Sequence, residues 1–152
     1  MIALLLISVL AGVFLERALY YRELAEKSAM EQVALDVRSS VNLRVAELVL
    51  ENRFAELGAM PAQTPMDLLA GKPQNYLGVL DEPQPASQAG GNWYFDKKSK
   101  EVVYCVDLGR YFAPDESGRP CVSWHVVLVP GNDASSAPQW ARFQVVKPYR
   151  WF

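Results

Sequence analysis

The first fifteen residues of the chain carry no charged side chain, and the first proline is Pro61. This run continues without any turn signal into charged helix formers at Glu16 and Arg17. The pattern predicts one unbroken helix from the N-terminus to Leu57, roughly 85 Å long, which is more than twice the thickness of a bilayer core. Its predicted membrane part, residues 1–15, has as its large apolar side chains Ile2, Leu4, Leu5, Leu6, Ile7, Val9, Leu10, Val13, Phe14 and Leu15.

The length of the apolar run allows three interpretations. Fifteen residues rise about 22 Å along a helix, whereas a hydrocarbon core is about 30 Å thick. A cleaved signal peptide would have a basic start and a small-residue cleavage site, neither of which is evident. A buried core helix without charge on any face would need a large protein around it. The composition favours the third interpretation, a membrane span that lacks its first few residues.

The rest of the chain, about 137 residues, is enough for one domain with a modest core. The formal net charge of −2 gives no reason to expect a nucleic-acid partner. A basic and aromatic C-terminus is weak evidence for such a partner, because these residues more often decorate the surface of a sheet. Its members are Trp140, Arg142, Lys147, Tyr149, Arg150 and Trp151.

Residues 16–57 form the predicted amphipathic part of the helix, supported by opposite charges four residues apart, Arg22 with Glu26 and Glu23 with Lys27. At 100° per residue, two apolar stripes lie on opposite sides. The first stripe, expected to pack on a sheet, contains Met30, Val33, Ala34, Val37, Val41, Val45 and Leu48. The second packs either beneath a covering loop or against neighbouring helices of an assembly, and contains Leu43, Ala46, Leu50, Phe54 and Leu57.

Residues 58–91 are a predicted connecting loop with one short helix, which Thr64 would cap and Pro65 would begin. From residue 92 to residue 152 the hydrophobic period changes from 3.6 to 2, which indicates strands. The expected fold class is therefore α+β, a long N-terminal helix packed on a four-stranded antiparallel sheet. The four predicted strands are 92–96, 101–107, 121–129 and 140–147.

Two cysteines, Cys105 and Cys121, fall on the more polar faces of two predicted strands. If these strands are neighbours, the side chains can meet and form a disulfide in an oxidising compartment such as the periplasm. The alternative is a pair of unrelated thiols in a reduced protein. The membrane anchor favours the disulfide, while the spacing alone does not.

Residues with catalytic or metal-binding potential are few. His125 is the only histidine, and no motif supplies partners for a metal, so it is predicted to be a surface residue of a strand. Asp96, Asp107 and Asp115 lack the regular spacing of a calcium loop. No nucleophile elbow, phosphate loop, dinucleotide fingerprint or zinc motif is present. We therefore expect no enzyme activity, no cofactor, no metal and no small-molecule substrate.

The order of elements resembles the type IV pilin and type II secretion pseudopilin family, in which a half-membrane, half-amphipathic helix precedes an antiparallel sheet. The outline covers most of the chain. The segments that carry the resemblance are 9–15 (VLAGVFL), Tyr20-Tyr21, 25–29 (AEKSA), 43–48 (LRVAEL), 65–69 (PMDLL), 75–78 (NYLG), 92–96 (NWYFD) and Val103-Tyr104.

This chain departs from the family at its start, because it contains no basic leader ending in glycine before phenylalanine and glutamate. Aligned with the family, Met1 would fall about six residues after the processing point. Six more residues would give a run of about 21, or roughly 31 Å, long enough to span. We therefore expect Met1 to be an internal or misassigned start, and the alternative is a divergent, unprocessed member. Arg17 and Arg22 alone would place the head in the cytoplasm, and a basic leader would reverse that orientation.

The resemblance implies a structural subunit, minor or accessory, of a type IV pilus or a type II secretion pseudopilus. Its partners would be other pilin-like subunits, bound through the helix, and the inner membrane. The chain would cross that membrane once, hold its C-terminal domain in the periplasm, and enter a filament. The alternative function is a monomeric, membrane-anchored periplasmic module that binds another protein or assists assembly.

Overall fold

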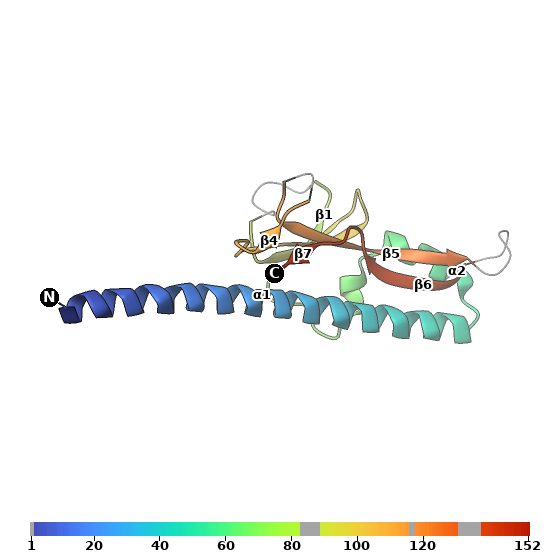
Figure 1. Ribbon diagram of the computed structural model, residues 1–152. Helices are drawn as coiled ribbons and strands as arrows, with labels where there is room; N and C mark the ends of the chain where they lie inside the picture. The colour runs from blue at the N-terminus through green and yellow to red at the C-terminus, as the bar shows by residue number, and fades with distance from the viewer. Residues whose placement is uncertain (1, 83–88, 116–117, 131–137) are drawn as a thin grey trace.

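The computed structural model describes residues 2–82, 89–115, 118–130 and 138–152, and it leaves out the side chains of Leu5, Pro138 and Gln139. Helix α1 (Ile2–Leu50) is 49 residues long, which corresponds to about 74 Å. It projects from a head that covers one side of its second half (Figure 1). The predicted boundary at Leu57 is wrong, because the chain leaves the helix after Leu50.

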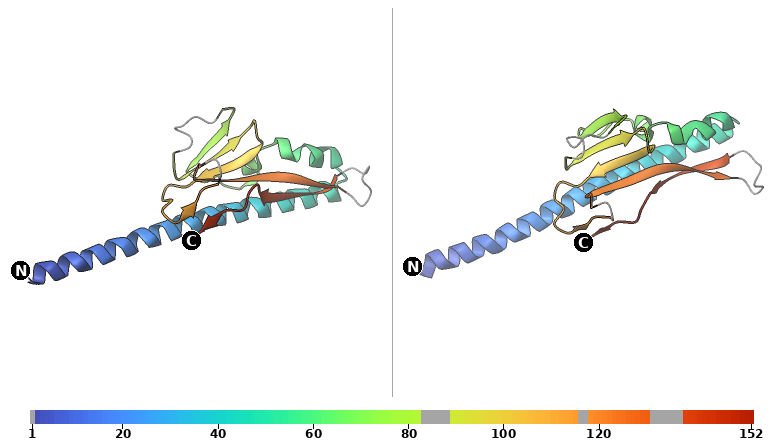
Figure 2. Two further views of the ribbon diagram at one scale, coloured as in Figure 1. Left: turned by 45° about the horizontal axis from the view of Figure 1, so that its top comes forward. Right: turned by 90° about the horizontal axis from the view of Figure 1, so that it is seen from above.

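The chain reverses direction through Asn52, whose φ of 57° lies in the left-handed region that asparagine tolerates. The backbone N–H of Arg53 then donates to the carbonyl of Leu48 at 2.8 Å. Helix α2 (Phe54–Ala59) follows and lies beside the far end of α1 (Figures 1 and 2). Two short 3-10 helices come next, η1 (Met60–Ala62) and η2 (Pro65–Leu68).

The predicted short helix does begin at Pro65, but as a 3-10 turn, and the Thr64 side chain makes no capping hydrogen bond. The Thr64 hydroxyl lies instead 3.3 Å from the Tyr76 hydroxyl. Strand β1 (Tyr76–Leu80) also lies within the region predicted as loop. Residues 83–88 of that region, and 131–137 between the last two long strands, are outside the described residues.

The main sheet has five strands in the order β1-β2-β3-β5-β6, so the prediction of four strands is corrected. β2 (Asn92–Asp96), β3 (Glu101–Cys105), β5 (Cys121–Pro130) and β6 (Pro138–Val145) are antiparallel, as predicted. β1 is added at one edge, parallel to β2. A second, two-stranded sheet joins β4 (Phe112–Ala113) to β7 (Arg150–Trp151).

The core lies between α1 and the sheet. The first predicted stripe of the helix is confirmed, because Met30, Ala34, Val37, Val41, Val45 and Leu48 are all buried and Val33 packs against them. From the sheet side come alternate strand residues, among them Trp93, Val102, Trp124 and Phe143. The sheet therefore covers only the half of the helix that follows Tyr20 and leaves the apolar half free (Figure 2).

Candidate membrane and assembly surfaces

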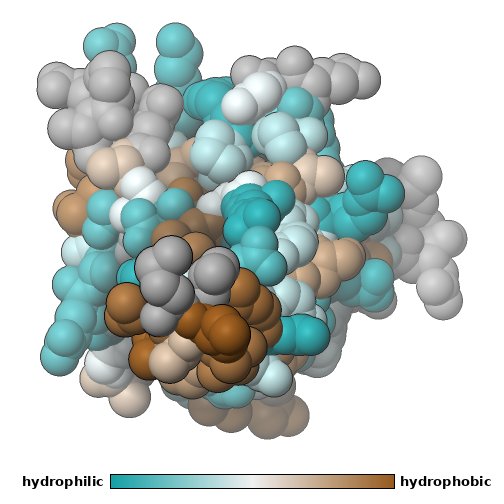
Figure 3. All heavy atoms as spheres, turned by 60° about the vertical axis from the view of Figure 1, so that its left-hand side comes forward, coloured by the Kyte–Doolittle hydropathy of each residue, from teal (hydrophilic) through white to brown (hydrophobic). Residues whose placement is uncertain are grey.

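The apolar half of α1 makes up the first candidate surface. Its described large side chains are exposed from Ile2 to Leu15, with 77% of Phe14 accessible. α1 is long and apolar enough to cross a membrane, and no part of its most apolar 18-residue stretch is buried in the structure. Figure 3 views this end of the molecule, where the hydrophobic helix stands in front of a head of mixed polarity. Met1 and the Leu5 side chain, both part of the predicted membrane segment, lie outside the described residues.

A polar clamp holds the head where the helix emerges from it. Glu23 is 2% exposed, and its Oε1 accepts hydrogen bonds from the backbone N–H of Tyr111 at 2.8 Å and from Trp151 Nε1 at 2.9 Å. One turn later, Glu26 accepts from the Tyr104 hydroxyl at 2.9 Å and from the backbone N–H of residues 107 and 108 at 2.6 and 2.9 Å. We call these two carboxylates and their five donors the clamp.

The clamp replaces the predicted ion pairs of Arg22 with Glu26 and of Glu23 with Lys27, neither of which forms. Both carboxylates bind the head instead, and Lys27 Nζ donates to the backbone carbonyl of Trp151 at 3.1 Å. The sequence did contain a signal for Glu23. It lies seven residues before Met30 and so extends the buried stripe by two helical turns.

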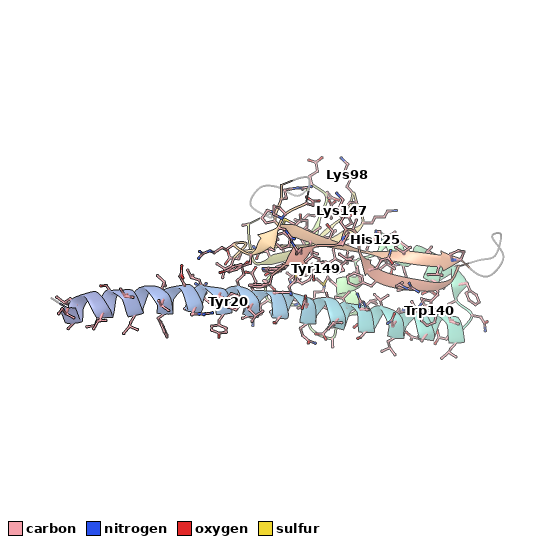
Figure 4. The ribbon with its side chains drawn as sticks, in the orientation of Figure 1. Tyr20, Lys98, His125, Trp140, Lys147 and Tyr149 are labelled. Carbon is pink, nitrogen blue, oxygen red and sulfur yellow. A yellow bond between two sulfur atoms is a disulfide. The ribbon has the colours of Figure 1, made fainter. Side chains whose placement is uncertain are left out.

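The environment of two head tyrosines supports the same packing. Burial and the neighbouring Glu26 carboxylate raise the pKa of Tyr104 well above its ordinary value. Burial and Glu31, which accepts from the Tyr149 hydroxyl at 3.3 Å, raise the pKa of Tyr149 to about 12. Figure 4 shows Tyr149 between the sheet and the helix. Both hydroxyls are therefore held neutral against acidic residues of α1.

The second predicted stripe is only partly present as a surface. Leu43 and Leu50 are 74% and 83% exposed, and Ala46 is half-buried. Leu57 is fully buried in the core, and Phe54 packs against that core from α2. The grouping of these five residues on one helix face is wrong, because the reversal at Asn52 turns the last two residues inward.

The face of α1 opposite the sheet nevertheless carries a longer neutral surface, which we call the outward stripe. Its residues recur every three or four positions, none is charged, and all but the half-buried Ala46 are exposed: Tyr21, Ala25, Ser28, Gln32, Leu35, Ser39, Leu43, Ala46 and Leu50. Two of its polar side chains are satisfied within the helix, since Ser28 donates to the Leu24 carbonyl and Gln32 to Asp36. The helix face that points away from the protein core usually carries the charged residues. In α1 the charged residues lie outside the outward stripe.

The outer face of the sheet carries the disulfide. β3 and β5 pair with Cys105 opposite Cys121, and the structure joins the two sulfurs across 16 residues of sequence, as predicted. Cys105 is buried there with Tyr94 and Val103, so this face is less polar than the strand pattern indicated.

Other residues considered from the sequence are dispersed. His125 is half-buried on β5, with its Nε2 3.5 Å from the Gln144 side-chain nitrogen. Asp96 accepts from backbone N–H groups of its own turn, and Asp115 pairs with Lys147 at 3.2 Å. Within the described ranges, no three His, Cys, Asp or Glu side chains gather as a metal site would require. Trp151, predicted as part of a surface patch, is buried in the core.

A hollow of about 460 Å³ lies between the small sheet and the outer face of the large one. Charges of both signs line it, from Glu101, Asp115, Arg119, Lys147 and Arg150. Such a mixed lining does not select one class of ligand. The apolar half of α1 and the outward stripe therefore remain the candidate functional surfaces.

Comparison with known proteins gives no relative. No family model, no curated protein and no solved structure matches this chain. The functional argument therefore rests on the helix and head themselves.

Proposed function

We propose that this protein is a pilin-like structural subunit, minor or accessory, of a type IV pilus or a type II secretion pseudopilus. The subunit is stored in the inner membrane by the apolar half of α1, with its head in the periplasm. During growth that half moves from lipid into the apolar centre of a helical bundle, and the heads form the outside. The role is mechanical and requires no catalytic site.

One observation carries the proposal: a single helix has a free apolar half and a docked half whose outward side is neutral. A helix that only tethered a head would need an apolar end, but its outer side would gain from charges in water. Small and apolar side chains on the outward stripe allow a second helix to approach closely and bury surface against it. Neighbouring copies in a filament would supply such helices.

The experiment is crosslinking of the intact protein in its native membrane, comparing the wild type with Leu50→Asp and Leu43→Asp. Both leucines are highly exposed, so the charge should leave the fold intact. In a packed helix interface, however, an unpaired carboxylate is costly to bury. We expect ladders of identical subunits from the wild type and their loss in both variants.

Arg38→Gln is the matched control, because it changes the net charge by the same unit at an exposed position of α1 outside the outward stripe. It should keep the ladders. Normal assembly of Leu50→Asp would refute helix packing through the outward stripe. A single foreign partner in place of the ladders would support the alternative function, a monomeric membrane-anchored module.

A further inference from the structure

Aromatic rings gather at the end of the head nearest the membrane half of α1. The Tyr20 ring meets the rings of Tyr111 and Phe152 edge-on, with centroids 5.6 and 5.2 Å apart, and those two rings stack at 5.1 Å. Tyr21 adds a fourth ring, 5.6 Å from Tyr20. Tyr21, Tyr111 and Phe152 each leave 40% or more of their surface accessible.

Three arginines lie close in sequence to these rings: Arg17 and Arg22 flank Tyr20 and Tyr21 on the helix, and Arg110 precedes Tyr111. Arg17 and Arg22 are exposed on the helix, and the Arg110 guanidinium lies 5.9 Å from the Tyr111 ring centroid. Among the described residues none of the three forms an ion pair. We call the four aromatic residues and these three arginines the collar.

The collar is fixed to the helix. Glu23 holds the backbone N–H of Tyr111 and the indole of Trp151, and the backbone N–H of Phe152 donates to the Tyr111 carbonyl at 3.2 Å. The head residues of the collar, Arg110, Tyr111 and Phe152, are therefore held at a fixed position along α1. Figure 4 shows Tyr20 on the helix where the head begins, with Lys98 on the side of the head away from the helix.

The distance of the collar from the apolar run along α1 matches the depth of a lipid headgroup layer. Tyr20 is five residues beyond Leu15, the last residue of the apolar run, which corresponds to about 7.5 Å. Each headgroup layer occupies roughly 5–7 Å between the hydrocarbon core and water. Tyrosine rings are enriched at this depth, and arginine side chains extend along apolar surface to reach phosphates there.

We propose that the collar is a membrane-docking surface, in which the underside of the head rests on the phosphodiester headgroups around its own membrane helix. The collar directly follows the apolar half of α1 along the helix. If that half spans a bilayer, the surface next to the collar is the lipid headgroup layer, so lipid is the occupant that we propose. The inference needs a membrane-spanning α1 but no filament assembly. It can therefore fail or succeed independently of the proposed function.

The test reconstitutes dilute full-length protein in vesicles of phosphatidylethanolamine and phosphatidylglycerol, with a nitroxide at one of two sites. Gly109→Cys places the label beside the collar, where an added Cβ makes only ordinary contacts. Ser39→Cys places it on the same helix about 36 Å beyond Leu15, on the outward stripe, which is in water as long as the diluted subunits are apart. Docking predicts that a water-soluble nickel chelate relaxes the label at 109 much less than the label at 39. A nickel-chelating lipid should show the reverse preference.

Two variants show whether the collar causes the shielding. Tyr111→Ser/Phe152→Ser removes two exposed rings, and Arg17→Gln/Arg22→Gln/Arg110→Gln removes the cations while leaving every ring in place. Each should bring the label at 109 closer to the water accessibility of the label at 39, whereas Arg38→Gln should not. Equal accessibility of the two labels in the unaltered collar would overturn the proposal, and so would shielding that survives in both variants.

Discussion

Glu23 shows how one side chain can join two parts of a chain that are far apart in sequence. It is a buried carboxylate on an otherwise apolar stripe, and the donors it accepts from come from residues 111 and 151. A buried charge is tolerated only where hydrogen bonds replace its hydration. Here a backbone N–H and an indole N–H provide that replacement, so the pairing is specific as well as stabilising.

We expect Glu23→Ala to destabilise the head by about 2–4 kcal/mol, because it leaves the buried Trp151 indole and the part-buried Tyr111 N–H without an acceptor. Chemical unfolding followed by tryptophan fluorescence measures the loss, and Trp151 itself should report a changed environment. Glu31→Ala is the control, since Glu31 is partly exposed and should cost no more than about 1 kcal/mol. A cost for Glu23→Ala as small as for Glu31→Ala would show that the clamp contributes little.

The raised pKa values of Tyr104 and Tyr149 predict alkaline sensitivity. In the unfolded chain both hydroxyls ionise near pH 10, whereas in the folded head the pKa of Tyr149 is about 12 and that of Tyr104 is also raised. The unfolded state therefore loses protons first, so the contribution of these two tyrosines to stability should be constant below about pH 10 and fall as the pH rises from about 10 through 12. Unfolding midpoints across this range, with tyrosinate absorbance, measure the effect. Tyr149→Phe should make the decline shallower, and an unchanged slope would contradict the assignment.

At the scale of elements, the sequence predicted those parts whose period is unambiguous. The buried stripe of α1 and the four antiparallel strands follow from periods of 3.6 and 2. The strand faces made a Cys105–Cys121 disulfide possible, but that the two strands are neighbours is known only from the structure. Strand β1 was missed because it is only five residues long and contains Gly78, which is typical of a turn and has a φ of 96° in the structure. The segment is a strand because it pairs with β2.

Two further errors have local physical causes. The end of α1 was placed seven residues too late because neither proline nor glycine marks it, and the left-handed residue is Asn52. The clamp was missed because Glu23 and Glu26 stand four residues from opposite charges, a pattern that usually indicates a solvated helix face. Which donor a carboxylate accepts from is decided by tertiary packing, which a helical wheel does not contain.

The disulfide between β3 and β5 should stabilise the head through the loop it closes. For a loop of this length, chain entropy of the unfolded state predicts about 3 kcal/mol. Cys105→Ala/Cys121→Ala should therefore lower the free energy of unfolding by that amount, which urea unfolding measures as a lower midpoint. A reductant should lower the wild-type midpoint similarly while leaving the variant unchanged. Equal midpoints for oxidised and reduced wild type would contradict this.

At the scale of the whole molecule, the chain has two environments along one axis. The apolar half of α1 is exposed, and the head begins only where the charged residues do. No other described part of the chain covers that half, which is consistent with a single-pass membrane anchor.

Leu10→Arg tests this placement, because an arginine deep in a membrane helix costs about 2.5–3.5 kcal/mol on insertion scales. We expect much of the variant protein to be released from membranes by carbonate, while wild type stays bound. Leu43→Arg adds the same charge to an exposed site on the docked half and should remain bound. Release of the wild type itself would show that α1 does not span the bilayer.

The position of the clamp has a mechanical consequence. Its five hydrogen bonds join rod and head at the end where a pull on the rod would enter, while the covalent connection at Asn52 lies at the opposite end. A force that pulls on the N-terminal end of α1 therefore loads these hydrogen bonds in shear before it reaches the covalent turn. The head then moves together with α1 as one rigid body. With the clamp broken, the same force would peel the sheet away from the rod, with the turn as hinge.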